Sequence, residues 1–399
     1  MSDLLPFAAA LEQLLAGVEP LPAQAVSIDQ CAGRVLAQPL LAHLTQPPFA
    51  AAAMDGYAIR WADLHQSWRV VGESAAGHGW PGTLAAGETV RIFTGAPLPA
   101  GADTIVVQEE VARDGDIARL SGEGPPHEGA HIRKAGQDFA AGDMLIVAGT
   151  RLAPPHLGLA AAAGHGELPV VRRPRVTLVA TGDELVPPGV MPGPGQIASS
   201  NPAMLAPLLR WAGADVEDPG LIPDRADALA AAVENSDADF ILTIGGASVG
   251  DHDLVVPVLR QLGAELDFWN IALKPGKPLL AGRLAGRRVL GLPGNPVSAF
   301  VTALLFAVPL VARMAGRRHA LPLATLPLAA PLPANGPRRD HLRARRVAGG
   351  VEAFARQDSA LLSLLASADV LIIREPHAPA AAAGAPVTCI ALDMFHSVF

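Results

Sequence analysis

Short apolar runs and longer apolar blocks divide the chain into regions with different patterns of apolar positions. Between residues 41 and 147, short β-branched runs are interrupted by Gly and Pro, as in "GETVRIFTGAPLPAGADTIVVQEE". This spacing is typical of short strands that are joined by hairpins. We therefore predict a β-rich lobe in this part of the chain.

The region from residue 175 to about residue 315 instead alternates between strand and helix patterns. The runs "RVTLVATG", "DFILTIGG" and "RRVLGLPG" are apolar throughout, and helix patterns follow them. Asn201 and Asp224 are predicted N-caps, Gly213 ends the first helix, and Asn295 opens a long apolar helix. Repeated strand–helix units with apolar strands predict a doubly wound, mostly parallel α/β domain.

The two ends of the chain have different patterns again. The first 20 residues are apolar at helical spacing and lack a basic leader segment, so they predict an amphipathic helix. After Gly316 the sequence is Pro-rich and then forms short strands, which predicts a small C-terminal β domain. The apolar stretch 298–312 is shorter than the roughly 20 residues that a bilayer requires, so we expect a buried helix and no membrane partner.

Composition narrows the function further. The formal net charge is -8 and 17% of the residues are charged, so we expect no basic surface for nucleic acid. The two cysteines, Cys31 and Cys389, are too few for a disulfide framework and match no metal-ligand spacing. These features favour a protein of the reducing cytoplasm.

Polar residues gather where the predicted parallel strands end, which is where such sheets bind ligands. "ATGDEL" places Asp183 and Glu184 directly after a strand, and "TIGGASVGDHD" supplies glycines, a serine and two further aspartates. "LKPGKP" supplies Lys274 and Lys277 shortly before "LPGNP". Three strand ends of one sheet therefore carry candidate ligand-binding residues.

These residue types together favour a phosphorylated ligand that is held with a metal. Glycines at a helix N-terminus expose backbone N–H groups to an anion, and lysines add positive charge. Carboxylates at the same edge would repel a bare phosphate, so they imply a divalent cation, Mg²⁺. Asp183, Asp251 or Asp253 taken singly is equally consistent with a helix N-cap.

One motif supports a different function. "GASVG", residues 246–250, matches the strand–turn–helix elbow of serine hydrolases, with Ser248 as the nucleophile. The downstream histidines His341, His377 and His396 fall in the C-terminal region, outside the predicted sheet. A hydrolase would also leave "LKPGKP" and "DHD" without a role, so it is the weaker alternative.

In this order, "AMDGYA", "RIFTGAPLPAGADTIVVQEE", "HIRKAGQDF", "ATGDEL", "GQI..SN..ML", "TIGGASVGDHD", "LKPGKP" and "LPGNPVSAF" form a specific set. The chain resembles the molybdopterin molybdenumtransferases, the molybdenum insertases that include the E domain of gephyrin. The resemblance implies Mg²⁺-dependent insertion of molybdate into adenylylated molybdopterin, with release of AMP. It also implies a homodimer whose cleft lies between the α/β domain of one subunit and the β lobe of the other. Molybdopterin adenylyltransferase and molybdoenzyme maturation proteins are its expected partners.

The resemblance further implies four domains in each subunit. They are a molybdopterin-binding α/β domain, a discontinuous linking domain, a β-rich lobe and a C-terminal β-barrel. Their expected ranges are 1–20 with 175–317, 21–42 with 139–174, 43–138, and 318–399.

The resemblance also assigns roles by motif. Residues expected to act in catalysis are Asp55, Thr94, Asp138, Glu184 and Asp253. Residues expected to hold metal are Asp183, Glu184, Asp224, Asp251 and Asp253. Residues expected to bind substrate are Arg133, Thr181, Gly182, Asp224, Gly245, Gly246, Ser248, Gly250, Lys274, Lys277, Pro293, Gly294 and Pro296. From the residues alone, Asp55 also fits an Asx turn with Gly56, and Thr94 fits a plain turn.

The sequence departs from the family pattern at several positions. Ala50–Ala52 replace an acid, a variable residue and a serine; Ser199 replaces an Asp, Asn270 a frequently basic residue, and His131 an Asn. Lost polar groups make a weakened paralogue that carries molybdopterin the second hypothesis.

Overall fold

The computed structural model describes residues 4–245, 254–317 and 321–393, and the chain forms two compact units. The first comprises Met1–Gln24, Gly33–Ala37 and Val170–Phe399, and the second comprises Ala25–Ala32 and Gln38–Pro169. The chain passes between them several times. Two of the segments in which it does so are β1 (Ala23–Ser27) and β12 (Glu167–Val171), and these two strands pair with each other. The finer division into four domains stays a prediction.

The first unit is built on a seven-stranded sheet with the order β16-β13-β18-β22-β21-β19, to which β17 adds beside β13. Its members are β13 (Arg175–Thr181), β16 (Asp215–Glu217), β17 (Leu221–Ile222), β18 (Phe240–Ile244), β19 (Glu265–Trp269), β21 (Leu280–Leu284) and β22 (Arg287–Leu292). Pairing is parallel from β16 and β17 to β22, and antiparallel at β21 and β19. The predicted mostly parallel sheet is therefore confirmed.

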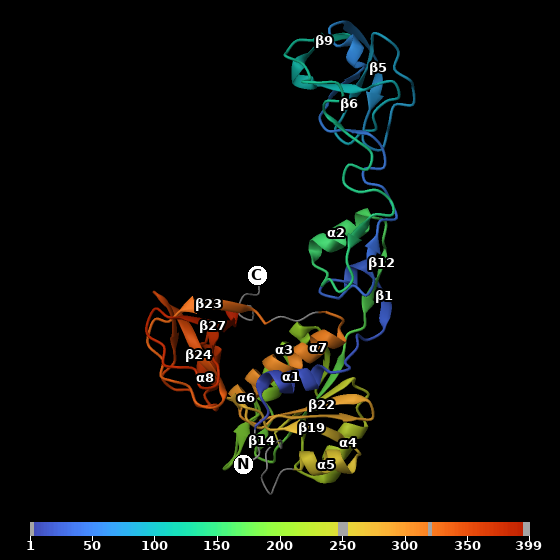
Figure 1. The fold of residues 1–399 in the computed structure, drawn as a ribbon. Helices are drawn as coiled ribbons and strands as arrows, with labels where there is room; N and C mark the ends of the chain where they lie inside the picture. The colour runs from blue at the N-terminus through green and yellow to red at the C-terminus, as the bar shows by residue number, and fades with distance from the viewer. Residues whose placement is uncertain (1–3, 246–253, 318–320, 394–399) are drawn as a thin grey trace. The chain divides into compact units, whose positions relative to one another are not determined.

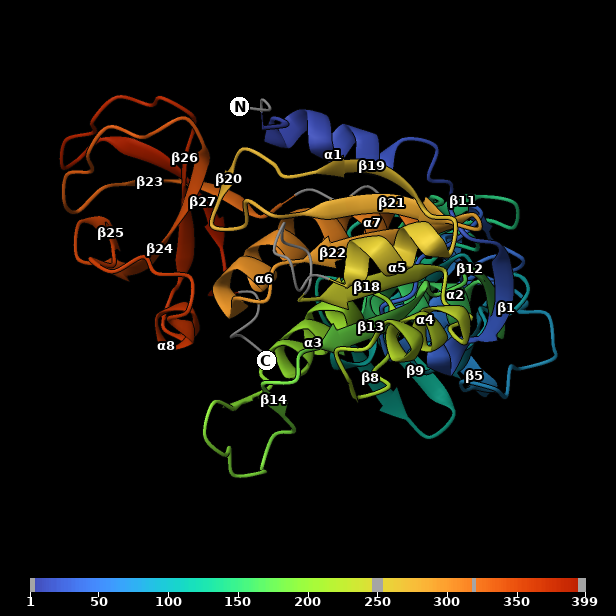
Figure 2. The same ribbon diagram turned by 90° about the horizontal axis from the view of Figure 1, so that it is seen from below.

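Helices cover both faces of this sheet, as doubly wound folds require (Figures 1 and 2). Figure 1 shows α1, α3 and α7 on one side of the sheet and α4 and α5 on the other. Every residue of β18 is buried, which explains its uninterrupted apolar sequence. The helices are α1 (Phe7–Leu15), α3 (Asn201–Ala212), α4 (Ala226–Glu234), α5 (Val255–Gln261), α6 (Pro296–Thr302) and α7 (Val308–Met314).

The long apolar helix is continuous from Pro296 to Met314, because a π-helical turn (Ala303–Ala307) joins α6 to α7. By length and composition alone it would be long enough to cross a membrane. However, 89% of its apolar window is buried inside the structure, as in a core helix. The predicted buried helix is confirmed.

The C-terminal part of the first unit is a second sheet with the order β20-β24-β26-β27-β23, and β25 pairs with β24. A bridge from Leu328, just after β23, to Val351 in β25 closes this order on itself, as in a barrel. The elements are β20 (Leu273–Lys274), β23 (Leu323–Pro327), β24 (Arg339–Val347), β25 (Gly350–Ala353), α8 (Leu362–Ala366), β26 (Val370–Arg374) and β27 (Pro386–Ala391).

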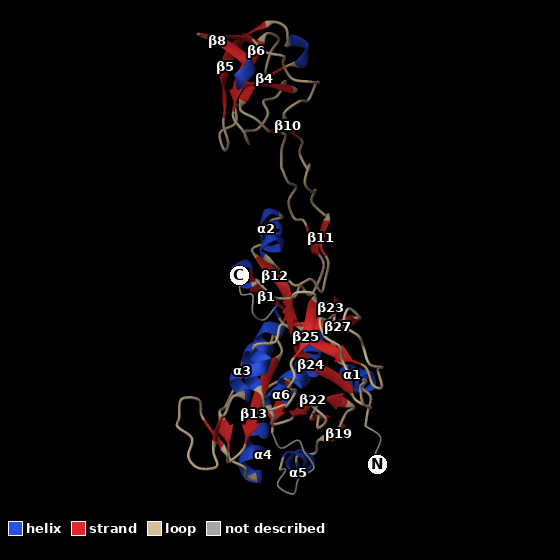
Figure 3. Ribbon diagram, turned by 90° about the vertical axis from the view of Figure 1, so that its left-hand side faces the viewer, coloured by secondary structure: helices blue, strands red, loops and turns tan. Residues whose placement is uncertain are grey.

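The second unit contains a six-stranded lobe with the order β7-β4-β6-β5-β9-β8, in which only β5 and β6 are parallel. Figure 3 shows mainly strands and loops in this lobe, as its Gly- and Pro-rich sequence predicts. Its strands are β4 (Gly56–Ile59), β5 (Ser67–Ser74), β6 (Glu88–Ile92), β7 (Thr104–Val107), β8 (Val111–Asp114) and β9 (Ile117–Leu120), with 3-10 turns η2 (Trp61–Asp63) and η3 (Gln108–Glu110). The rest of the unit contains η1 (Ile28–Gln30), β2 (Leu40–Leu41), β3 (Ala51–Ala52), β10 (Ile132–Arg133), β11 (Met144–Ile146) and α2 (Pro154–Ala162).

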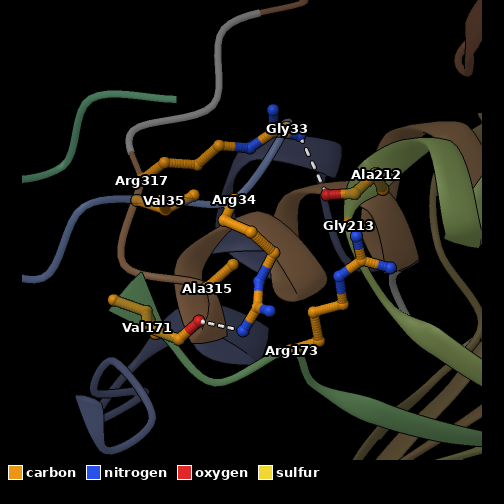
Figure 4. A pocket seen from close by; sticks show the side chains of 9 residues that line it. All are labelled: Gly33, Arg34, Val35, Val171, Arg173, Ala212, Gly213, Ala315 and Arg317. Carbon is orange, nitrogen blue, oxygen red and sulfur yellow. Dashed lines mark hydrogen bonds between the residues drawn. The ribbon is translucent and has the colours of Figure 1, made fainter. Parts of the chain in front are cut away.

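Two arginines join separate segments of the first unit (Figure 4). Arg34 Nη2 donates to the carbonyl of Val171 at 3.2 Å, and Arg317 Nη2 donates to the carbonyl of Ala212 at 3.1 Å. Ala212 is the last residue of α3, so Arg317 also complements the negative end of that helix. We therefore assign these arginines a structural role.

Candidate functional site

A cavity of about 500 Å³ lies at the carboxyl ends of β13, β18 and β22. It is the position at which an open α/β sheet binds ligands, and α3 and α6 begin beside it. Predicted site residues in its lining are Thr181, Glu184, Gly245, Gly294 and Pro296. The other lining residues include Ser199, Ser200, Asn201, Asn295 and Ala360.

Asp183 and Asp224 hold each other in place beside this cavity. The N–H of Asp183 donates to Asp224 Oδ2 at 3.2 Å, and the N–H of Asp224 donates to Asp183 Oδ1 at 3.1 Å. Thr181 Oγ1 also donates to Asp224 Oδ1. Asp224 was predicted to cap the next helix, and this is wrong: the N-cap of α4 is Arg225, because the Asp224 carboxylate bonds the β13 strand end instead.

The chemistry of these carboxylates fits a hard cation. Within the described ranges, neither a lysine nor an arginine forms a salt bridge with Asp183, Glu184 or Asp224. Carboxylate oxygens are the ligands that Mg²⁺ prefers. The described residues alone contain no group of three metal-ligand side chains, and Asp251 and Asp253 lie outside them. Mg²⁺ therefore stays a prediction.

Two glycines bring backbones together at the floor of the cavity. Gly245 has φ +86°, and a Cβ there would lie 3.0 Å from the carbonyl oxygen of Thr181. A Cβ on Gly294 would lie 3.8 Å from Gly245 Cα. The strand ends can approach this closely because these positions lack side chains. Gly246, Ser248 and Gly250, the rest of the predicted phosphate nest, lie outside the described residues.

The start of α3 supplies polar groups that the sequence analysis did not assign to the site. Asn201 was predicted to be the N-cap, and this is wrong: the N-cap is Ser200, and Asn201 is the first helical residue. Its side-chain Nδ2 instead donates to the carbonyl of Gly294 at 2.7 Å and so joins two of the lining segments. Ser199 is buried in the lining. The "SN" pair within a family motif was the available signal.

The "LKPGKP" loop does not line the cavity; it packs on α6, the helix that begins there. Lys274 and Lys277 are both exposed, and Lys274 Nζ lies 3.1 Å from Asp340 Oδ2. Gly276 places the loop against α6, because a Cβ there would lie 2.4 Å from Thr302 Cγ2. Pro293 is buried at the end of β22, and Gly182 is buried after β13.

In the second unit, Asp55 and Thr94 form one hydrogen-bonded pair. Asp55 Oδ1 accepts from the Thr94 N–H and from Thr94 Oγ1, both at 2.7 Å. The hydroxyl bond, followed by the backbone bond, lowers the pKa of the Asp55 carboxyl below its ordinary value. These bonds connect Asp55 to a residue 39 positions away, whereas an Asx turn would use the adjacent Gly56–Tyr57 backbone.

Arg133 and Asp138 lie at one cavity in the second unit. They line a cavity of about 360 Å³ together with Gln46, Pro47 and Gln137. Arg133 lies on β10, which pairs with β3 through Ala51. Of the four residues predicted in the β lobe, Asp55 is therefore bonded to Thr94, whereas Arg133 and Asp138 share the lining of one cavity.

Among the described residues, the structure supports neither candidate histidine as the base of the alternative hydrolase function. His341 is buried in the C-terminal sheet, where desolvation and, second, Arg339 lower its pKa to about 3. His377 follows β26 in the same part of the chain. Ser248 and His396 lie outside the described residues.

Family models match most of the chain. They describe the MoeA N-terminal region (domain I and II) over residues 5–164, a probable molybdopterin binding domain over 177–313, and the MoeA C-terminal region (domain IV) over 325–392.

Individual relatives agree with these matches. The chain is similar to the molybdopterin molybdenumtransferase of Haemophilus influenzae, with 38% identity over 315 residues that cover 77% of this chain and 76% of the relative. It is 39% identical to molybdopterin molybdenumtransferase 2 of Mycobacterium tuberculosis over 298 residues, covering 71% and 73% of the two chains. A crystal structure of a Pyrococcus horikoshii molybdopterin biosynthesis MoeA protein superposes with a TM-score of 0.85 and 29% identity, covering 98% of this chain and 99% of the other. The chain therefore belongs to the molybdopterin molybdenumtransferase family.

Proposed function

We propose that this transferase inserts molybdenum from molybdate into adenylylated molybdopterin, with Mg²⁺, and releases AMP. The observation that carries the proposal is the cavity at the strand ends, in a chain of the molybdenumtransferase family. Its lining combines backbone at glycines with hydroxyl and carboxylate side chains, which suits a phosphorylated ligand bound through a cation.

The residues divide the work by their chemistry. Asp183, Glu184 and Asp224 would hold Mg²⁺, which supplies positive charge against the pyrophosphate group when it is bound. The first turn of α3 begins at the cavity and has no side-chain cap; Pro202 contributes no N–H there, but the positive end of the helix dipole favours an anion. Lys274 and Lys277 provide exposed ammonium groups for the anionic reactants.

The test is AMP release from purified protein. We expect AMP formation from adenylylated molybdopterin to require both Mg²⁺ and molybdate. Asp224→Asn should reduce it by at least tenfold, because the carboxylate is lost while its shape is kept. Tight binding of adenylylated molybdopterin without molybdate-dependent AMP release would instead identify a molybdopterin carrier.

Asp55 can be tested separately from the cation site. We expect Asp55→Ala to lose turnover while it still binds adenylylated molybdopterin, and Asp63→Asn, which alters a buried carboxylate of the same lobe, serves as the control for folding. Unchanged turnover in Asp55→Ala would return Asp55 to a purely structural role.

We further propose that the protein is a cytoplasmic homodimer. Both cysteines are buried and neither forms a disulfide, which supports a reducing compartment. Sedimentation of the purified chain measures the assembly state. If residues of two chains act together, mixing the inactive Asp55→Ala and Asp224→Asn proteins should restore part of the AMP release.

A further inference from the structure

The C-terminal sheet reaches the "LKPGKP" loop through backbone pairing. β20 pairs in parallel with β24, and this register places Lys274 beside Asp340. The N–H of Arg339 also donates to the carbonyl of Ala272 at 2.9 Å. The loop that carries a predicted anion-binding lysine is therefore an edge strand of the C-terminal sheet.

Asp340 is a buried carboxylate whose one salt-bridge partner among the described residues is that lysine. Its side chain is 9% exposed, whereas the side chain of Lys274 is 49% exposed, and Lys274 Nζ lies 3.1 Å from Asp340 Oδ2. Within the described chain, Asp340 Oδ1 has no hydrogen-bond partner. A buried carboxylate is costly unless it is paired, so this pair restrains an otherwise flexible lysine.

A second contact attaches the same sheet region to the cavity. The N–H of Val297, in the first turn of α6, donates to the carbonyl of Ser359 at 3.1 Å. The next residue, Ala360, lines the cavity. The C-terminal part thus contacts both the lysine loop and a wall of the cavity.

From these contacts we infer that Asp340 is a positioning residue, which holds Lys274 in place to bind an anionic group of the substrate. The inference rests on the proposed function, in which Lys274 contacts an anion. One ammonium hydrogen is engaged by Asp340, and because the Lys274 side chain is about half exposed, the other ammonium hydrogens are left for a ligand. Restraining the lysine beforehand lowers the entropy that binding must remove.

Asp340 could also have the opposite effect on anion binding, and variants of Asp340 distinguish the two effects. A negative charge beside Lys274 could instead weaken anion binding by repulsion. Asp340→Asn removes the charge but keeps an oxygen that accepts a hydrogen bond from Lys274. Asp340→Ala removes both. Positioning predicts that Asp340→Ala binds anions more weakly than Asp340→Asn, whereas repulsion predicts that both bind more tightly than the natural protein.

The experiment is calorimetric titration of the full-length protein with inorganic pyrophosphate and, separately, with molybdate. We expect Asp340→Ala to raise Kd about three- to tenfold, which corresponds to ordering one long side chain. In the Lys274→Met background, Asp340→Ala should have no further effect, because the residue that it positions is absent. Glu352→Gln, which breaks the exposed salt bridge with Arg345 in the same sheet, is the control and should leave Kd unchanged.

The outcomes distinguish this inference from the proposed function. Tighter or unchanged binding in Asp340→Ala overturns the inference, as does a Lys274→Met protein that binds both anions like the natural one. If a lowered Tm shows that Asp340→Ala unfolds, Asp340→Asn is compared with the natural protein instead. Tighter anion binding by Asp340→Asn would then overturn the positioning role. A Kd within twofold of the natural value would support that role. Absence of AMP release by the natural protein, with Lys274-dependent anion binding intact, contradicts the proposed function alone.

Discussion

At the scale of single residues, two positions that depart from the expected family pattern share a backbone conformation. His131 has φ 60° and Asn270 has φ 81°, so both occupy the left-handed region. Asn, Asp and His are the non-glycine residues that tolerate this region best. His131 therefore suits this conformation, as would the Asn that the resemblance leads us to expect at this position, and its carbonyl accepts the N–H of Ala53.

This conformation makes a prediction for His131. A β-branched residue is poorly tolerated at positive φ, so His131→Val should destabilise the second unit by about 1–2 kcal/mol. His131→Asn should be neutral within about 0.5 kcal/mol. Urea denaturation followed by Trp fluorescence measures both, and equal stability of the two variants would contradict the backbone explanation.

Most of the alanines before Asp55 do not mark places where this chain has lost polar contacts at its surface. Ala51 and Ala52 form β3 and are 5% and 0% exposed, and Ala52 packs in the core of the lobe. The strand is hydrogen-bonded on both sides, to Ala96 and to His131 through its neighbour Ala53. Only Ala50 and Ala53 are partly exposed, so these positions give less support to the hypothesis of a weakened enzyme.

The Asp55–Thr94 pair predicts a titration. Thr94 lowers the pKa of Asp55 mainly through its hydroxyl, so Thr94→Val should raise that pKa towards its ordinary value. The backbone N–H of residue 94 remains, so part of the lowering should persist. NMR titration of the Asp55 carboxyl carbon measures this shift. A pKa that is the same in Thr94→Val and the natural protein would show that the pair does not form in solution.

At the scale of elements, the order of strands and helices was predictable because strands and helices each give a clear apolar pattern in the sequence. β13, β18, β22 and the helix that begins at Pro296 lie where the sequence placed them. The N-caps at Asn201 and Asp224 were mistaken because each side chain bonds a distant segment, Gly294 in one case and Thr181 and Asp183 in the other. Local rules describe helix ends only when tertiary partners do not compete for the capping side chain.

The long helix shows how one residue sets the geometry of an element. Pro309 has no backbone N–H and cannot continue the normal pattern of helical hydrogen bonds. Just before it, the N–H of Val308 bonds the carbonyl of Ala303, five residues back, which is the pattern of a π-turn. The chain therefore stays helical through the proline with a local widening.

The lysine loop makes a prediction at this scale. Gly276 has φ +105°, and a Cβ would lie 2.4 Å from Thr302 Cγ2 of α6, so Gly276→Ala combines backbone strain with a clash. Gly286 has φ +81° with nothing within 4 Å of a Cβ, so Gly286→Ala isolates the strain. We expect losses in unfolding free energy of about 2–4 kcal/mol for Gly276→Ala and about 1 kcal/mol for Gly286→Ala. Equal losses in chemical denaturation would show that the loop does not pack on α6.

At the scale of the whole molecule, the sequence predicted the fold class and the family better than the contacts between distant segments. The strand-end carboxylates and glycines were predictable because parallel strands end at one edge. Asp340 was not, since it follows an arginine pair in a Pro-rich region and becomes relevant only through the pairing of β20 with β24. Contacts between segments 66 residues apart leave no local pattern.

His341 predicts how the stability of the molecule depends on pH. Burial, with a smaller effect of Arg339, lowers its pKa in the folded chain from 6.5 to about 3. Between these values the unfolded chain binds a proton that the folded chain does not, so stability falls as the pH decreases from 6.5 towards 3. This single group can account for a loss on the order of 5 kcal/mol at pH 3.

Replacing the ring by an apolar side chain of similar size should remove that sensitivity. We expect the Tm of His341→Leu to exceed that of the natural protein by a margin that grows from pH 6.5 to pH 4, because only the natural chain gains a proton at residue 341 on unfolding. His65→Leu, which changes an exposed histidine of the β lobe, should leave the pH dependence unaltered. Calorimetric scans across this range test the expectation, and parallel Tm curves for His341→Leu and the natural protein would mean that His341 is protonated in the folded chain.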